Sequence, residues 1–157
     1  MKRWIFGSLV ETEAWAAHLA ALGPIPGVIY LRGDLGAGKT SLARALIHSL
    51  GYVGRVRSPT YTLVEAYPTP AGMVLHLDLY RLQAAEELEF LGVRDYLERP
   101  ALWLIEWPQR AEALLPKPDL ELHMSILASG EHVLQVLART PPWQERLHQL
   151  DRGRDLS

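Results

Sequence analysis

The stretch LRGDLGAGKTSLARAL, residues 31 to 46, decides the fold of this chain. Gly33, Gly38, Lys39 and Thr40 match the phosphate-loop pattern G-x-x-x-x-G-K-[ST]. The glycines allow a tight turn that brings backbone N–H groups close to phosphate oxygens. In this motif Lys39 places a positive charge beside the β- and γ-phosphates, and the Thr40 hydroxyl ligates Mg²⁺. The pattern therefore predicts a nucleotide-binding loop.

The flanking residues supply the strand and the helix that a phosphate loop requires. Residues 28 to 31, VIYL, form a short apolar run that is typical of a strand. After the loop, apolar residues recur at helical spacing until Gly51, a residue that commonly follows a helix C-terminus. The start of this helix adds its positive dipole end to the phosphate site.

The composition is that of an ordinary globular protein. The chain has 157 residues, 48% of them hydrophobic, which predicts one P-loop domain over residues 1–140, followed by a C-terminal helix or tail over residues 141–157. No apolar run has the length of a membrane span or of a signal peptide, so we expect a cytoplasmic protein without membrane contact. The absence of cysteine excludes disulfides, thiolate catalysis and cysteine zinc sites. The net charge of −2 argues against a basic nucleic-acid-binding domain.

The remaining pattern predicts alternating strands and helices. The expected strands cover residues 3–6, 28–31, the end of 58–67, 73–80, 101–105, 120–127 and 132–138. The expected helices cover residues 9–22, the stretch after the phosphate loop, 84–91, 109–115 and 143–150, with a further turn in 93–98 and a loose tail from Asp151. This layout predicts an α/β fold: a P-loop NTPase-like three-layer sandwich, with a mixed sheet, helices on both faces and antiparallel edge strands.

Two carboxylates follow apolar strands, where open α/β sheets place their ligand-binding groups. Asp78 ends VLHLD, and Glu106 ends ALWLIE. A nucleotide hydrolase needs a carboxylate in such a place to hold or orient Mg²⁺. We therefore expect Lys39, Asp78 and Glu106 to be the catalytic residues, the alternative being two solvated carboxylates at strand ends.

The segment between the P-loop helix and the Asp78 strand contains Ser58, Thr60 and Thr62. In switch-type nucleotidases a threonine at this place approaches Mg²⁺ and the γ-phosphate and moves on hydrolysis. The sequence alone favours the plainer interpretation of a Ser-Pro turn with ordinary strand threonines.

Two further side chains lie close to the carboxylates in sequence. Trp107 follows Glu106 and packs either near the nucleotide or, as the sequence favours, in the core. His76 alternates with leucines in its strand and is expected to face away from the core.

Five blocks together resemble one family. GDLGAGKTSLARAL, SPTYTLVEAY, HLDLYRL, EELEFLGVRDYL and LIEWPQR occur in this order within residues 8 to 127. They are similar to the TsaE (YjeE) family, bacterial P-loop ATPases of tRNA threonylcarbamoyladenosine synthesis. The resemblance implies a compact α/β sheet around the P-loop, ATP and Mg²⁺ as cofactors, and slow ATP hydrolysis by the isolated protein. It also implies TsaD and TsaB as partners, which modify ANN-decoding tRNA, so that contact with tRNA is indirect. Hydrolysis would reset that complex between turnovers.

The resemblance also assigns residues. It implies that Thr40 and Glu106 are Mg²⁺ ligands. It implies that Asp78 is an acid that either orients the attacking water or contacts the groups that surround the metal without binding the metal itself. It places Thr60 and Thr62 in a switch-like block and Thr12 near the nucleotide. The expected nucleotide-binding residues are Thr12, Gly33, Asp34, Leu35, Gly36, Ala37, Gly38, Lys39, Thr40 and Ser41.

Three other functions compete with an ATPase. A P-loop kinase of a small molecule or nucleoside needs an arginine-rich lid. No run of arginines forms an evident lid here, but Arg94 and Arg99 leave the kinase alternative open. A GTPase of the main class needs an N-K-x-D motif, which a chain without asparagine lacks. A non-catalytic nucleotide-dependent adaptor remains open, and the presence of Asp78 and Glu106 counts against it.

Overall fold

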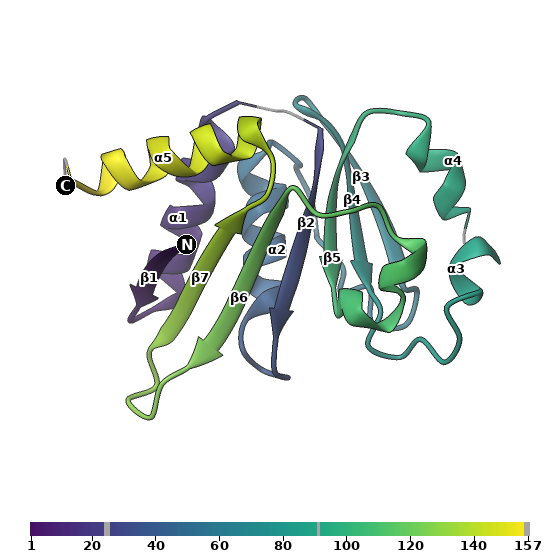
Figure 1. The fold of residues 1–157 in the computed structure, drawn as a ribbon, viewed down its shortest axis with the longest axis horizontal. Coiled ribbons are helices and arrows are strands. Elements are labelled where there is room, and N and C mark those ends of the chain that lie inside the picture. Colours follow the sequence, from purple (N-terminus) through teal and green to yellow (C-terminus); the bar gives the residue numbers. More distant parts are fainter. Residues whose placement is uncertain (24–25, 91, 156–157) are drawn as a thin grey trace.

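The strands form a single mixed sheet in the computed structural model, which describes residues 1–23, 26–90 and 92–155. Within these residues the sheet has seven strands in the order β1-β7-β6-β2-β5-β4-β3 (Figure 1). The strands are β1 (Lys2–Phe6), β2 (Gly27–Gly33), β3 (Val64–Thr69), β4 (Gly72–Asp78), β5 (Ala101–Glu106), β6 (Leu120–Ile126) and β7 (His132–Ala138). The helices are α1 (Leu9–Ala21), α2 (Lys39–Ser49), α3 (Glu87–Phe90), α4 (Val93–Leu97) and α5 (Pro141–Asp155), with 3₁₀ turns η1 (Pro108–Arg110) and η2 (Glu112–Leu114).

The centre of the sheet is parallel and its edges are antiparallel, as the sequence predicts. β2 pairs in parallel with β5 and β6, and β4 pairs in parallel with β5. β3–β4 and β6–β7 are hairpins, and β1 pairs antiparallel with β7 as an edge strand. Because parallel strands end at the same edge of a sheet, Gly33, Asp78 and Glu106 meet there.

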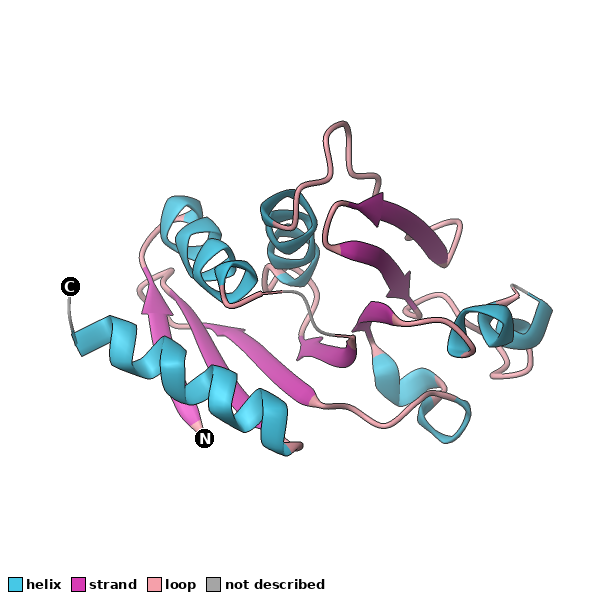
Figure 2. Cartoon of the chain, turned by 90° about the horizontal axis from the view of Figure 1, so that it is seen from above, coloured by secondary structure: helices cyan, strands magenta, loops and turns pink. Residues whose placement is uncertain are grey.

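Helices cover both faces of the sheet, which confirms the predicted three layers (Figure 2). On one face α1, α2 and α5 enclose an apolar cluster that includes Trp15, Leu46 and Trp143. On the other face α3, α4 and the 3₁₀ turns pack over a second cluster that includes Tyr30 and Trp103. Burying one such large apolar side chain contributes about 1.5–3 kcal/mol.

Two predicted helices are wrong in extent. The helix expected over 84–91 is reduced to α3, because Ala84 and Ala85 begin turns whose carbonyls accept from Glu87 and Leu88, three residues on. Leu91 lies outside the described residues. The helix expected over 109–115 is instead η1 and η2, which Ala111 separates with a non-helical φ of −150°.

The C-terminal helix is longer than predicted. α5 starts at Pro141, where the fixed φ of proline suits a first helical turn. It continues to Asp155, so residues 151 to 155, which were expected to form a loose tail, are helical. Leu156 and Ser157 lie outside the described residues. Trp143 anchors it against Gly27, where an added Cβ would lie 2.7 Å from the indole. None of the helices in the described ranges is long and apolar enough to cross a membrane.

Candidate functional site

The phosphate loop is held in shape by the two strands beside it. Gly33 has a φ of +145°, and a Cβ there would lie 2.4 Å from the carbonyl oxygen of Met124 in β6, so only glycine fits. Gly38 begins α2 in the left-handed conformation, with a φ of +102°. His132 of β7 places Nδ1 2.9 Å from the carbonyl oxygen of Ala37. Since a carbonyl only accepts, Nδ1 donates this bond and ties the loop to the sheet.

Lys39 lies at the centre of the loop with only 5% of its surface exposed. Its Nζ donates to the carbonyl oxygens of Gly33 and Asp34, at 2.9 Å for Asp34. The ammonium lies 4.2 Å from the ring centroid of Trp107. Burial lowers the pKa of Lys39, and the charges of Glu106, Asp78 and Asp34 oppose that change. A buried cation with only carbonyl partners favours an incoming anion.

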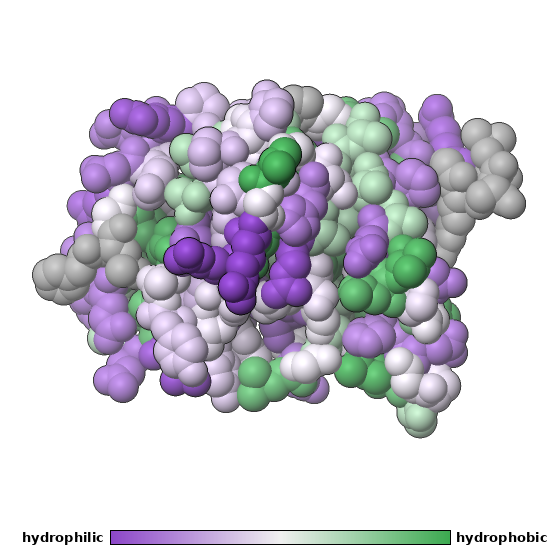
Figure 3. All heavy atoms as spheres, turned by 180° about the vertical axis from the view of Figure 1, so that it is seen from behind, coloured by the Kyte–Doolittle hydropathy of each residue, from purple (hydrophilic) through white to green (hydrophobic). Residues whose placement is uncertain are grey.

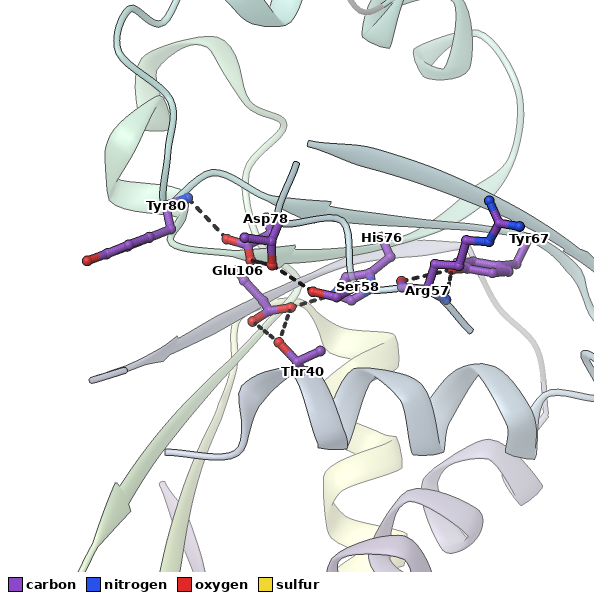
Figure 4. Close-up of polar contacts among 9 residues, drawn as sticks. Thr40, Arg57, Ser58, Tyr67, His76, Asp78, Tyr80 and Glu106 are labelled. Atoms are coloured by element: carbon purple, nitrogen blue, oxygen red, sulfur yellow. Dashed lines mark hydrogen bonds and ion pairs between the residues drawn. The ribbon is translucent and has the colours of Figure 1, made fainter. Parts of the chain in front are cut away.

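Asp78 and Glu106 face each other as register partners at the ends of β4 and β5. Thr40 Oγ1 donates to Glu106, at 2.8 Å from Oε1 and 3.1 Å from Oε2 (Figure 4). Asp78 Oδ1 accepts from the backbone N–H of Tyr80 at 3.1 Å. Burial raises the pKa of the Asp78 carboxyl; the Tyr80 N–H opposes this and the charge of Glu106 adds to it. The first turn of α2 and two strand ends thus bring three oxygen-bearing side chains together.

His76 corrects a prediction. It is fully buried on the face of the sheet that packs on α2, not turned away from the core. Its Nε2 lies 2.6 Å from Glu106 Oε2, so Glu106 accepts from both Thr40 and His76 (Figure 4). Because an ionised carboxylate only accepts, Nε2 carries the proton of this bond. His76 and Asp78 are two residues apart in one strand and therefore share a face.

The switch-like segment is connected to Asp78 through side chains and backbone. Thr60 Oγ1 lies 3.5 Å from Asp78 Oδ2, and Ser58 Oγ lies 2.7 Å from Thr60 Oγ1. The carbonyl of Leu63, which has an unusual φ of +67°, accepts from the Asp78 N–H at 3.0 Å. Thr62 is exposed and donates instead to Glu65 at 3.1 Å. Ser58 and Thr60 are therefore brought to the site, and Thr62 is not.

A depression of about 370 Å³ opens over these groups. Trp107 lines it and also packs on the second apolar cluster, so its place in the core is seen and its contact with a nucleotide stays a prediction. The Tyr80 ring lies 4.9 Å from that of Trp107. The full lining is Leu35, Gly36, Ala37, Gly38, Lys39, Thr40, Ser41, Thr60, Asp78, Tyr80, Arg81, Glu106 and Trp107. Its size is in the range of small-ligand pockets, about 300–1,000 Å³.

The residues present fit a phosphate chain and a hard cation. The glycine cradle and Lys39 suit phosphate oxygens. The oxygens of Thr40, Glu106 and Asp78 suit Mg²⁺, which binds through one or two carboxylates together with substrate phosphates and water. Over the described part of the chain, no three acidic or histidine side chains converge closely enough to hold a metal ion. A cation here would therefore complete its shell from phosphate and water.

Most of this lining was expected from the sequence, and three side chains in or next to it were not. Thr12 is buried in α1 and does not belong to the depression as the described residues form it, so its role stays a prediction. The unexpected residues are His76, Tyr80 and His132, whereas Arg81, which the sequence left open as either a phosphate contact or a solvated surface arginine, lines the depression. A signal existed for His76, since Asp78 was expected at the site and the alternation of a strand puts His76 on the same side. Nothing local to His132 marks it, because its contact is to a loop 95 residues away.

Comparison with known proteins points to one family. A family model described as "Threonylcarbamoyl adenosine biosynthesis protein TsaE" matches residues 6–133. A protein of Haemophilus influenzae named "tRNA threonylcarbamoyladenosine biosynthesis protein TsaE" is 43% identical over 113 residues, which cover 72% of this chain and 71% of that protein. A Bacillus subtilis protein of the same name is 30% identical and aligns over 99% of this chain and 97% of its own length. The crystal structure of Bacillus subtilis YdiB superposes with a TM-score of 0.78 at 26% identity, covering 98% of this chain and 95% of YdiB.

Proposed function

The chain belongs to the TsaE family, whose members take part in tRNA threonylcarbamoyladenosine biosynthesis, and we propose that it binds and hydrolyses ATP with Mg²⁺ in that process. Its partners in this proposal are TsaD and TsaB, with tRNA reached only through their complex. Hydrolysis lets the complex act on one tRNA after another.

The observation that carries the proposal is the bond from Thr40 to Glu106, which joins the phosphate loop to a strand end. In phosphoryl transfer the protein works mainly by positioning reactants and stabilising charge. This link sets the P-loop hydroxyl and a carboxylate at a fixed separation before any ligand arrives. Lys39, the residue before Thr40, supplies a positive charge to the same depression.

Each residue has a distinct task in this proposal. The backbone N–H groups of the loop bind phosphate oxygens, and Lys39 exchanges its carbonyl partners for the β- and γ-phosphates. Thr40 and Glu106 hold Mg²⁺, which, when bound, neutralises charge that develops on the phosphates. Asp78 accepts a hydrogen bond from the attacking water and orients it. Burial raises the pKa of Asp78, so this carboxylate is a better proton acceptor than an exposed one.

Reconstitution of tRNA modification tests the proposal. TsaB, TsaD, a threonylcarbamoyl donor and an excess of tRNA are combined with this protein and ATP. We expect several modified tRNAs per TsaD, and about one when ATP is replaced by a non-hydrolysable analogue. Modification that cycles equally well without this protein, or with its Glu106→Ala variant, contradicts the proposal. Transfer of phosphate to a small molecule or nucleoside in the same preparation would favour the kinase alternative.

A further inference from the structure

A second depression, separate from the phosphate loop, lies between α2 and the loop that follows it. Its volume is about 630 Å³, and it is lined by Arg44, His48, Arg55, Val56, Arg57 and Ser58. We call it the arginine groove. Figure 3 views the face that carries α1 and α2 and shows strongly hydrophilic side chains gathered near its centre. Because the chain as a whole has a net charge of −2, this positive charge is a local feature.

The arginine groove is held in place by its own hydrogen bonds. His48 Nε2 lies 2.9 Å from the carbonyl oxygen of Gly54, which ties the loop to α2. The Tyr67 hydroxyl accepts from the Arg57 N–H at 2.9 Å and donates to the Arg57 carbonyl oxygen at 3.1 Å. Tyr67 is 4% exposed, so this anchor belongs to the core. A surface fixed before binding loses less conformational entropy when a partner docks.

The arginines of this groove are available for a partner. Arg44, Arg55 and Arg57 are exposed and form no ion pair with an acidic side chain of the described residues. Arg32 and Arg139, by contrast, are both paired with Glu121. A guanidinium binds a carboxylate through two parallel hydrogen bonds, which makes arginine a preferred residue at interfaces.

The arginine groove is connected to the candidate nucleotide site by a series of side-chain hydrogen bonds. Ser58 lines the groove, its Oγ contacts Thr60, and Thr60 reaches Asp78. A change in the position of Thr60 when a γ-phosphate is present would therefore move the edge of the groove. Segments of this kind are the usual elements through which nucleotide state alters a docking surface.

We propose that the arginine groove docks an acidic surface of the TsaB–TsaD complex. The inference rests on the proposed function, and it adds where on this chain that partner binds and by what chemistry. A protein partner fits better than RNA, because the three arginines of the groove, on a chain with a net charge of −2, can neutralise few phosphates, and neutralised phosphates supply most of the affinity for nucleic acid. A concave groove whose backbone is held in place and whose guanidinium groups are free to bind suits carboxylate side chains that project from a folded surface.

The test measures binding of this protein to immobilised TsaB–TsaD with ATP and Mg²⁺ at several salt concentrations. The variant is Arg44→Glu combined with Arg55→Glu, since both residues lie outside the nucleotide site. The matched control is Arg99→Glu, an exposed arginine on the opposite side of the sheet. We expect the double variant to raise the Kd about tenfold or more and to weaken its dependence on salt. The control should bind as the unmodified chain does, and ATP turnover by the isolated double variant should be unchanged.

Each other outcome overturns the inference in a recognisable way. If the double variant binds TsaB–TsaD like the unmodified chain, the groove is not the docking surface, while the proposed function stands. If the unmodified chain does not bind TsaB–TsaD at all, the proposed function itself fails. If the unmodified chain shifts purified tRNA on a gel and the double variant does not, the groove binds RNA instead.

Discussion

Among the described residues, two that are not glycine have positive φ angles: Leu63, at +67°, and Trp107, at +57°. The left-handed conformation costs a non-glycine residue about 1–2 kcal/mol. Both residues border the candidate site: Trp107 lines the depression, and Leu63 holds the Asp78 backbone. Strained residues of this kind gather at functional sites, where the surrounding structure maintains them.

Lys39 is the residue whose loss should abolish hydrolysis. Its ammonium group lines the depression and donates to two carbonyl oxygens of the phosphate loop. We expect Lys39→Ala to lower ATP turnover by about 100-fold or more, because the charge that develops on the phosphates loses its stabilising partner. Steady-state phosphate release measures this, and circular dichroism checks folding. Turnover at the unmodified level by a folded variant would refute the assignment.

Glu106 and Asp78 should respond differently to Mg²⁺. Glu106 bonds to Thr40 and is expected to hold the cation, so Glu106→Ala should raise the Mg²⁺ concentration needed for half-maximal activity. Asp78→Ala should lower the rate more than the affinity for nucleotide, because Asp78 is expected to act on water. A Mg²⁺ titration of activity beside nucleotide-binding curves separates the two. An unchanged Mg²⁺ midpoint in both variants contradicts these roles.

His76 should act as a positioning residue for Glu106. His76→Leu removes the donor 2.6 Å from Glu106 Oε2 and leaves Thr40 as the remaining side-chain donor to that carboxylate among the described residues. We expect about a tenfold or larger loss of Mg²⁺ affinity, as for other residues that orient a metal ligand. His76→Gln, which offers an N–H at a similar reach, should recover part of it. The readout is Mg²⁺-dependent binding of a fluorescent nucleotide; equal affinity in both variants would show that His76 only fills space.

At the scale of elements, Glu121 links three neighbouring strands or their ends. It lies in β6 and accepts from Arg32 in β2 at 3.1 Å and from Arg139, just after β7, at 2.8 Å. Burial raises the pKa of Glu121, but the hydrogen bonds from Arg139 and Arg32 outweigh this and hold the pKa below its ordinary 4.5. The ionised form therefore stabilises the fold above pH 4.5, and this contribution is lost as pH falls through the lower folded pKa.

Replacing Glu121 tests this linkage of strands. Glu121→Gln should lower the free energy of unfolding at pH 7 by about 1–3 kcal/mol, because the negative charge and one of the two oxygens that accept from Arg32 and Arg139 are lost. The difference from the unmodified chain should begin to shrink as the pH falls below 4.5, the ordinary pKa of this carboxyl group. Urea titrations at pH 7 and at pH 3 measure it, with the exposed Glu98→Gln as control. A pH-independent difference would mean that packing, not charge, is responsible.

At the scale of the whole molecule, the chain has little left over for a substrate pocket. Of its 157 residues, most build one sheet and the helices that cover it. The depression over the phosphate loop lies beside the arginine groove, with Ser58 to Thr60 between them. This arrangement suits a protein whose ATP hydrolysis depends on a partner.

The isolated protein should therefore be a poor ATPase. We expect its turnover to rise about tenfold or more when TsaB and TsaD are added together, since partner proteins raise the rates of some P-loop hydrolases strongly by stabilising the charge of the transition state. Phosphate release is measured with each partner alone and with both. A fast rate without partners, or no change with both, contradicts this expectation.

The phosphate loop, the central strands and the two carboxylates could all be predicted from the sequence. These are local features: a glycine pattern, apolar runs and the polar residue that follows each run. Parallel strands of an α/β sheet end at one edge, so the pattern alone was enough to predict that Asp78 and Glu106 lie together there.

The contacts between distant segments became clear only from the three-dimensional structure. His76 meets Glu106 across 30 residues, and His132 meets the phosphate loop across 95. The extent of α3 and α5 also depended on packing, since Trp143 fixes α5 against Gly27 at the other end of the chain. Burial and pairing set these features, and both depend on which segments become neighbours in space, a property that local periodicity does not contain.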